Sequence, residues 1–227
     1  MNVLPTVYSK GELCELIEEI GFLPYFSNEM RGFSVMDITR GMKWWSDIPE
    51  LDPWDWRVQI SGEHKIAYGK LFKGNAGFVS LKWYPVFANF RRNGYDFQSR
   101  YEEGLASYKS KQIMLHFEST GTELASNALK RAAGFGKEGL KGFEGAITAL
   151  QMQTYLTVSG FRQRLNKRGE PYGWNVGYFS TPEDVFGEAV VTSCYGEAPE
   201  VSREKIVDRL AEYVHTAFDA EIRKFIS

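Results

Sequence analysis

Residue types that bind and process nucleic acids gather between positions 44 and 101. Two are the indole rings of Trp54 and Trp56, and the polar ones are Arg57, Lys70, Asn89, Arg91, Arg92, Asp96 and Arg100. Aromatic rings stack on exposed bases, and arginines hold phosphates. A carboxylate or carboxamide can position a water and stabilise a cationic sugar while a base leaves. The set predicts a cleft in which Asn89 and Asp96 are catalytic, while the tryptophans, the arginines and Lys70 bind substrate.

The densest part of that set surrounds an expected helix end. Ser80 can cap a helix, and Asn93-Gly94 can end it. A carboxamide, two cations and a carboxylate then come together just at the end of this helix. The same residues also fit a purely structural role, because tryptophans are mostly buried. They would then form a small aromatic core covered by arginine–aspartate pairs.

A second pattern, over residues 120–180, is typical of a winged helix-turn-helix. A helix from Thr120 or Thr122 to Ala133 is followed by Gly134 and Gly136, which can turn the chain, and by a second helix over 137–153. The apolar period then changes to two, which predicts half-buried strands over 154–161 and 172–179 on either side of a polar tip. We therefore expect an α+β protein, mostly helical, with a winged helix-turn-helix module and an aromatic-rich N-terminal part.

In a DNA-binding winged helix, the second helix enters the major groove and the hairpin contacts phosphates. The candidates on that helix are Lys137, Lys141, Thr148 and Gln151. The candidates at the hairpin tip are its four cations, Arg162, Arg164, Lys167 and Arg168. Two alternatives remain, because a solvated hairpin tip is usually charged and because winged helices also bind proteins.

The remaining elements are expected to pack around this module. Apolar periodicity and capping residues predict helices over 10–20, 54–61, 104–119, 182–194 and 203–226, and strands over 65–72 and 77–79. The chain then divides into an aromatic-rich α+β region over 1–103, the winged helix-turn-helix module over 104–195 and a C-terminal helix over 196–227. The apolar stripe of that last helix can cover a core or bind a protein partner.

Composition limits the functional classes. The 227 residues carry a net charge of −2 with a pI near 6.0, which counts against a protein that coats nucleic acid nonspecifically. Neither Cys14 nor Cys194 has metal-ligand spacing, and the histidines lack it too, so we expect no metal and no other cofactor. The two cysteines could form a disulfide, but in a cytosolic protein we expect two reduced thiols. No signal peptide or bilayer-spanning apolar run is visible, which predicts a cytoplasmic protein with no membrane partner.

Several longer runs resemble a known family. Residues 66–80 include Ala-Tyr-Gly-Lys-Leu-Phe and Ala-Gly-Phe-Val-Ser, residues 85–97 read Pro-Val-Phe-Ala-Asn-Phe-Arg-Arg-Asn-Gly-Tyr-Asp-Phe, and residues 52–57 read Asp-Pro-Trp-Asp-Trp-Arg. These runs are similar to the AlkZ-related proteins, and the resemblance covers most of the chain. That family is named for its similarity to winged-helix DNA glycosylases, which excise alkylated or crosslinked bases.

One departure from the glycosylases concerns catalysis. The glycosylases are longer and carry an early Gln-x-Gln or Gln-x-Asp motif. Here the first glutamine is Gln59, and the one Gln-x-Gln is Gln151-Met152-Gln153, at the end of the expected second helix. We therefore assign the catalytic role to Asn89 and Asp96 and keep Gln151 as a DNA-binding candidate.

Three hypotheses follow. The leading one is a protein that binds double-stranded DNA and is related to winged-helix DNA glycosylases, with excision of alkylated or crosslinked bases as its activity. The second is a noncatalytic protein-interaction module that uses the winged helix and the C-terminal helix. The third is an enzyme acting on a small nucleotide or another metabolite.

Overall fold

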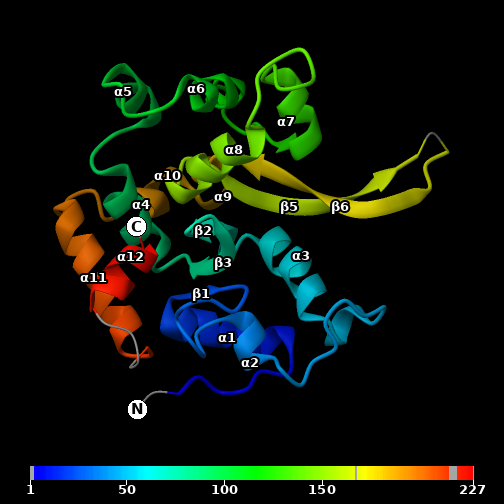
Figure 1. Cartoon of the computed structure of the whole chain (residues 1–227), viewed down its shortest axis with the longest axis vertical. Coiled ribbons are helices and arrows are strands. Elements are labelled where there is room, and N and C mark those ends of the chain that lie inside the picture. The colour runs from blue at the N-terminus through cyan, green and yellow to red at the C-terminus, as the bar shows by residue number, and fades with distance from the viewer. Residues whose placement is uncertain (1–2, 167, 215–218, 227) are drawn as a thin grey trace.

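A single antiparallel sheet joins strands from the first and the middle parts of the chain. The computed structural model describes residues 3–166, 168–214 and 219–226. Helices account for 46% of these described residues and strands for 18%. The six described strands run in the order β1-β3-β2-β5-β6-β4. They are β1 (Phe22–Pro24), β2 (Ile66–Phe72), β3 (Asn75–Ser80), β4 (Leu124–Ala125), β5 (Thr157–Leu165) and β6 (Pro171–Ser180) (Figure 1).

Local capping signals set the first helices. In α1 (Lys10–Ile20) the Ser9 hydroxyl accepts the amide of Glu12, and Gly21 ends the helix at a φ of 97°. In α3 (Pro53–Glu63) the Asp52 carboxylate accepts the amide of Trp54 at 2.8 Å. Both helices are confirmed. The segment between them contains the short helices α2 (Val35–Ile38) and η1 (Pro49–Leu51).

Aromatic packing holds this first part together. Phe22 is fully buried, and four rings surround it with centroids 5.1–6.1 Å away: Phe33, Phe72, Trp83 and Phe87. Phe72 belongs to the β2–β3 hairpin and Phe87 to α4 (Tyr84–Arg92), and Trp83 lies just before α4. Helix α5 (Phe97–Glu102) follows directly. The contacts of Phe22 with Phe33, Trp83 and Phe87 are edge-to-face, and each adds about 1 kcal/mol beyond the burial of apolar area.

Residues 104–153 differ from the three helices expected there, over 104–119, from Thr120 or Thr122 to Ala133, and over 137–153. The helices there are α6 (Tyr108–Met114), η2 (Leu115–Phe117), α7 (Ser126–Ala132) and α8 (Phe143–Met152). The expected start of a helix at Thr120 or Thr122 is wrong, because β4 pairs with β6 first. The expected start of the next helix at residue 137 is also wrong. Residues 134–142 form a tight loop in which Gly134 O accepts Leu140 N, and a side chain on Gly139 would collide with Gly134 O.

Strands β5 and β6 form a long hairpin whose outer half leaves the body of the protein (Figure 1). Residues 157–160 are buried on both faces, so the expected half-buried alternation is wrong there. Helix α3 packs against β5, which also lies in the interior of the sheet between β2 and β6. From Arg162 outward the strand is exposed. We call residues 161–175 the arm.

The C-terminal region folds back onto the first part. It contains α9 (Pro182–Phe186), α10 (Glu188–Val191), α11 (Pro199–Ala211) and α12 (Asp219–Ile226). One uninterrupted helix over 203–226 is therefore wrong, and α12 returns so that Phe225 stacks on Phe72, 5.8 Å between centroids. Ile222, Phe225 and Ile226 of α12 are buried in this chain's own core, so this apolar stripe offers little surface to a protein partner.

The sheet and the core both cross the expected boundary at residue 103. Tyr68 of β2 pairs with Val158 of β5, and one continuous cluster of buried apolar side chains runs from Val7 to Ile226. The three-part division of the chain stays a prediction. Cys14 and Cys194 are free thiols. Among the described helices, none is both long and apolar enough to cross a bilayer.

Candidate functional site

A small cavity lies where α3, β2, α8 and the base of the arm meet. We call it the α3–α8 cavity; its volume is about 240 Å³. Its lining consists of Trp54, Arg57, Tyr68, Gly69, Lys70, Ala76, Ser126, Glu144, Ile147, Gln151, Val158, Phe161, Gly177 and Phe179. Four of the residues expected from the sequence to bind substrate or DNA meet there: Trp54, Arg57, Lys70 and Gln151.

Arg57 is the central cation of this cavity. Its guanidinium carbon lies 3.7 Å from the ring centroid of Trp54 and 4.5 Å from that of Phe161. The residue is 7% exposed, and its buried Nη1 has no hydrogen-bond partner among the described residues. Cation–π contacts with these two rings therefore stabilise much of the positive charge of this guanidinium. Trp54 and Arg57 share one face of α3 because they are three residues apart.

Helix α8 supplies the opposite wall. The Oε1 atom of Gln151 accepts the backbone amide of Lys70 at 3.0 Å, and its Nε2 donates to Ile147 O at 3.1 Å. The Nζ atom of Lys70 donates to Thr148 Oγ1 at 3.2 Å. A side chain at Gly69 would lie 3.2 Å from Gln151 Oε1, so this glycine permits the close approach of β2 to α8.

Glu144 lines the same wall and is the single carboxylate among the cavity's lining residues. It is exposed and lies seven positions before Gln151, on the same face of α8. Burial raises the pKa of the neighbouring Tyr68 to about 12, so that phenol stays neutral. The cavity thus combines aromatic walls, a stacked guanidinium, a lysine and one carboxylate. These are groups that can bind a flat polar ring and stabilise a developing positive charge.

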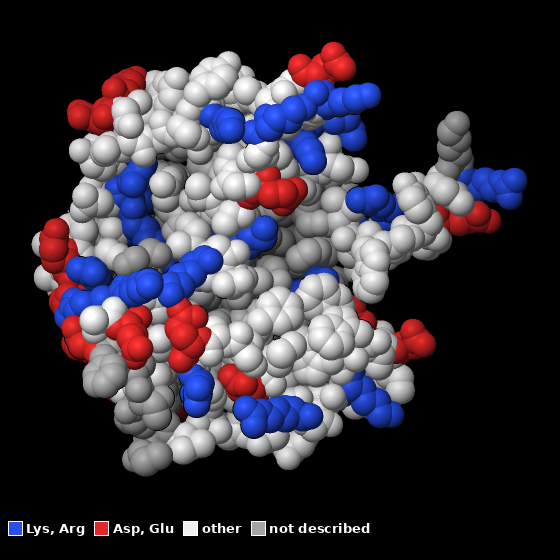
Figure 2. Space-filling model, in the orientation of Figure 1, with Lys and Arg blue, Asp and Glu red and all other residues white. Residues whose placement is uncertain are grey.

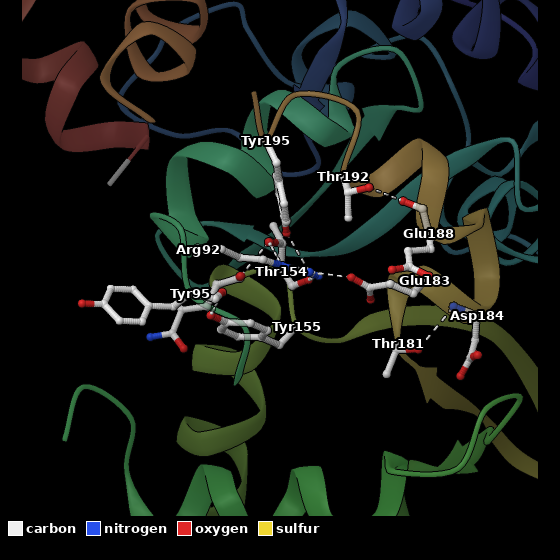
Figure 3. Close-up of polar contacts among 11 residues, drawn as sticks. Arg92, Tyr95, Thr154, Tyr155, Thr181, Glu183, Asp184, Glu188, Thr192 and Tyr195 are labelled. Carbon is white, nitrogen blue, oxygen red and sulfur yellow. Dashed lines mark hydrogen bonds and ion pairs between the residues drawn. The ribbon is translucent and has the colours of Figure 1, made fainter. Parts of the chain in front are cut away.

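Arg92 lies elsewhere and is the centre of a buried network (Figure 3). Its Nη1 donates to the Glu183 carboxylate at 2.5 Å and to the Tyr195 hydroxyl at 2.9 Å, and its Nη2 donates to Thr154 O at 2.6 Å. Burial alone would lower the pKa of Arg92, but the hydrogen bond and charge of Glu183 outweigh it and raise the pKa. All of these partners are residues of the protein itself. The network therefore connects α4 to α9 and to the end of α8.

The two expected catalytic residues also hold structural contacts. Asn89 is 3% exposed, and its Nδ2 donates to Ser202 Oγ at 2.9 Å and to Glu197 O at 3.2 Å. Asp96 is exposed and caps α5 by accepting the amide of Ser99 at 2.8 Å and its hydroxyl at 2.9 Å. Neither lines the α3–α8 cavity. Their catalytic roles stay predictions.

Replacing Asp96 with alanine should lower the free energy of unfolding by about 1 kcal/mol, the usual value of a helix cap. The amide of Ser99 holds the pKa of this carboxyl below its ordinary value, so its contribution is present above the unfolded pKa. It is lost as the pH falls through the folded value, and the variant should then approach the wild type below about pH 4. Urea unfolding at several pH values measures this. A difference that stays constant down to pH 2 would contradict a charged cap.

The other arginines and Trp56 stabilise the body of the protein. Arg100 donates to the carbonyls of Arg91 and Arg92 at the end of α4, at 3.3 and 3.2 Å. Trp56 is fully buried, and its Nε1 donates to Glu50 O at 3.0 Å. Arg91 donates to the carbonyls of Leu71 and Ile226 and lines a separate cavity.

Basic side chains gather over α6 and α7 and again on the arm (Figure 2). Lys137 and Lys141 lie in the loop before α8, where Lys141 Nζ donates to Gly136 O at 2.6 Å. Lys130 from α7 lines the same shallow depression. On the arm, Arg162 pairs with Glu123 and lies over the ring of Tyr178. Arg164 and Arg168 have no ion pair among the described residues, and Lys167 lies outside them.

The arm also carries exposed apolar side chains that were not predicted to function. Trp174 is 75% exposed, Leu165 60% and Tyr172 51%. The sequence predicts that Tyr172 and Trp174 lie on one face of a strand, but it does not indicate that this strand extends beyond the body of the protein. Glu144 and Phe161 were missed as well. Glu144 has the spacing of an ordinary solvated helix residue, and Phe161 that of an ordinary strand residue.

A comparison with known protein families decides the relationship. A family model described as AlkZ related matches residues 7–227. The chain belongs to the AlkZ-related family. The match includes all of the residues that line the α3–α8 cavity of this AlkZ-related protein, together with its arm. No curated protein and no solved structure matches the chain.

Proposed function

We propose that this AlkZ-related protein binds double-stranded DNA through a winged helix and receives an unpaired base in the α3–α8 cavity. The elements α6, β4, α7, α8, β5 and β6 follow one another in the order of a winged helix, with β4 paired to β6 beside the hairpin. The arm is then the wing, and α8 is the second helix of the helix-turn-helix. The cations before α8 and on the arm supply the phosphate contacts.

One observation carries the proposal: the α3–α8 cavity lies at the base of the arm. Phe161 belongs to both, and Gly177 and Phe179 of β6 also line the cavity. DNA held by the arm would therefore reach a cavity with aromatic walls and a stacked guanidinium. Flipped bases are received by such pockets, through stacking and contacts to their polar edges.

The same geometry supports base excision as the activity. Breaking a glycosidic bond needs a group that stabilises the cationic sugar or positions a water, and a carboxylate does both. Within the α3–α8 cavity that group is Glu144. This proposal differs from the expectation for Asn89 and Asp96, since those side chains are used by Ser202, Glu197 and Ser99.

The binding part of the proposal is tested on the arm. Replacing Arg164 and Arg168 with alanine should reduce the slope of log affinity against log salt by about 2, since each lost phosphate contact removes about 1. Arg162 should contribute less, because Glu123 already neutralises it. Fluorescence anisotropy with labelled duplex DNA at several salt concentrations gives the slope.

A matched control is the double variant Arg31→Ala, Lys43→Ala, which removes two exposed cations flanking α2. It should bind DNA with the wild-type slope. An unchanged slope in the arm variant would remove the arm from the DNA interface. The exposed Trp174, Tyr172 and Leu165 also fit a protein-binding hairpin. Absence of DNA binding at every salt concentration would favour that noncatalytic interaction module.

A further inference from the structure

A second and larger cavity lies on the other side of α8. Its volume is about 690 Å³, within the range of small-molecule sites. We call it the α4–α11 cavity, because it lies between the end of α4, the end of α8 and the start of α11. Its lining consists of Phe90, Arg91, Asn93, Ala149, Met152, Gln153, Pro199, Glu200 and Arg203. It shares no lining residue with the α3–α8 cavity.

The charges around this cavity are unbalanced. Arg91 and Arg203 are its cations, and Glu200 is its single carboxylate. Arg203 is half-buried and forms no ion pair or hydrogen bond among the described residues; its guanidinium carbon lies 5.9 Å from the ring centroid of Phe90.

Arg91 adds a buried cation that has no acidic partner in the described part of the chain. It is 9% exposed, and its Nε and Nη1 atoms have no hydrogen-bond partner among the described residues. Burial lowers its pKa to about 10, opposed by the nearby Tyr84. The guanidinium still stays protonated near neutral pH. A cation in such surroundings acts strongly on its neighbourhood, because the local dielectric is low.

The remaining lining separates into polar and apolar parts. Asn93 and Gln153 use their side-chain amides in no hydrogen bond within the described part of the chain. Phe90, Met152 and Ala149 supply apolar surface. Phe90 together with Arg203 offers a platform for a flat ring, and the two carboxamides offer donors and acceptors for its edge. The thirteen-residue helix α11 also begins here and adds the positive end of its dipole.

We propose that the α4–α11 cavity binds a small anionic ligand with a planar heteroaromatic ring, of the class of nucleoside monophosphates. The ring lies on Phe90, the carboxamides of Asn93 and Gln153 contact its edge, and Arg203 holds the phosphate in the field of Arg91. This site is independent of the DNA-binding proposal, since no arm residue takes part.

Isothermal titration of the full chain with AMP, GMP, CMP and UMP tests this site. At least one should bind, and its affinity should exceed that of the matching nucleoside and of inorganic phosphate by tenfold or more, because the ring and the phosphate each contribute. Arg203→Ala should weaken binding about tenfold or more, the usual loss for a hydrogen bond to a charged group. Glu200→Gln should tighten it, and Ala149→Leu should block it by filling the cavity.

Lys43→Ala is the control and should bind as the wild type does, since Lys43 is an exposed cation outside the cavity. Thermal unfolding of each variant checks that it folds. Failure of all four nucleotides to bind overturns the proposal. So does binding that survives both Arg203→Ala and Ala149→Leu, because the nucleotide then lies elsewhere. Equal affinity for inorganic phosphate would overturn the part assigned to the ring.

Discussion

Replacing Arg92 with methionine should lower the free energy of unfolding by about 3 kcal/mol, the lower end of the cost of breaking a buried ion pair. Arg92 is 6% exposed and joins Glu183, Tyr195 and Thr154, which belong to three separate segments. Methionine keeps the apolar stem but leaves these acceptors without their donor. The lower end applies because the Glu183 side chain is 28% exposed, so water can reach its carboxylate. Urea unfolding of the variant and the wild type measures the difference.

The network also holds an unusual backbone. Thr154 has a φ of 61°, which is rare for a β-branched residue. Its carbonyl and hydroxyl both accept from Arg92, so the arginine stabilises the conformation in which the chain leaves α8 for β5. Loss of Arg92 should therefore also loosen the end of α8. Faster amide hydrogen exchange in residues 150–156 would accompany the lower stability.

Lys205→Met serves as the control, because its pair with Glu197 is exposed. Exposed pairs contribute at most about 1 kcal/mol. The variant Glu183→Gln should lie between the two, since its amide oxygen can still accept one hydrogen bond from Arg92. A loss below 1 kcal/mol for Arg92→Met would mean that the network contributes no more than a surface pair.

The elements that the sequence predicts correctly are those fixed by neighbouring residues. Ser9 and Gly21 delimit α1, and Asp52 with Pro53 starts α3, because capping acts over a single turn. The start of α8 was misplaced for the opposite reason. Gly139 allows a backbone contact with Gly134, and that contact depends on the folded loop rather than on any helical period.

In the candidate site, too, the sequence does not reveal contacts that form only in the folded protein. The sequence grouped Arg57, Lys70 and Arg92 by proximity along the chain, but folding separates Arg92 from the other two. Arg92 finds its carboxylate 91 positions away, in Glu183. Lys70 meets Gln151 across 81 positions. Residue type was enough to identify Trp54 and Arg57 as site residues, because their indole and guanidinium groups lie on the same face of one helix. Residue type could not identify Glu144, because only the packing of α8 on β2 brings it to the cavity.

Replacing Glu144 with glutamine should reduce base excision about a hundredfold or more, the usual contribution of a positioned acid or base. The change removes the single carboxylate that lines the α3–α8 cavity while keeping the size of the side chain. Because Glu144 is exposed, the fold should be unaffected. DNA affinity should rise slightly, since a negative charge near the phosphates is lost. The assay incubates duplex DNA that carries alkylated bases with each protein and counts abasic sites.

Three control variants test whether Glu144, rather than another residue, is responsible for excision. Glu138→Gln removes an exposed carboxylate six positions earlier, in the loop before α8, and should leave excision unchanged. Asp96→Asn keeps a good helix cap and should also leave it unchanged, whereas loss of excision there would restore the catalytic role expected of Asp96. Gln153→Ala tests the Gln-x-Gln motif directly. Excision that survives Glu144→Gln but not Gln153→Ala would move the chemistry from the α3–α8 cavity to the opposite side of α8. No excision by the wild type on any alkylated duplex would contradict base excision and leave DNA binding as the proposed function.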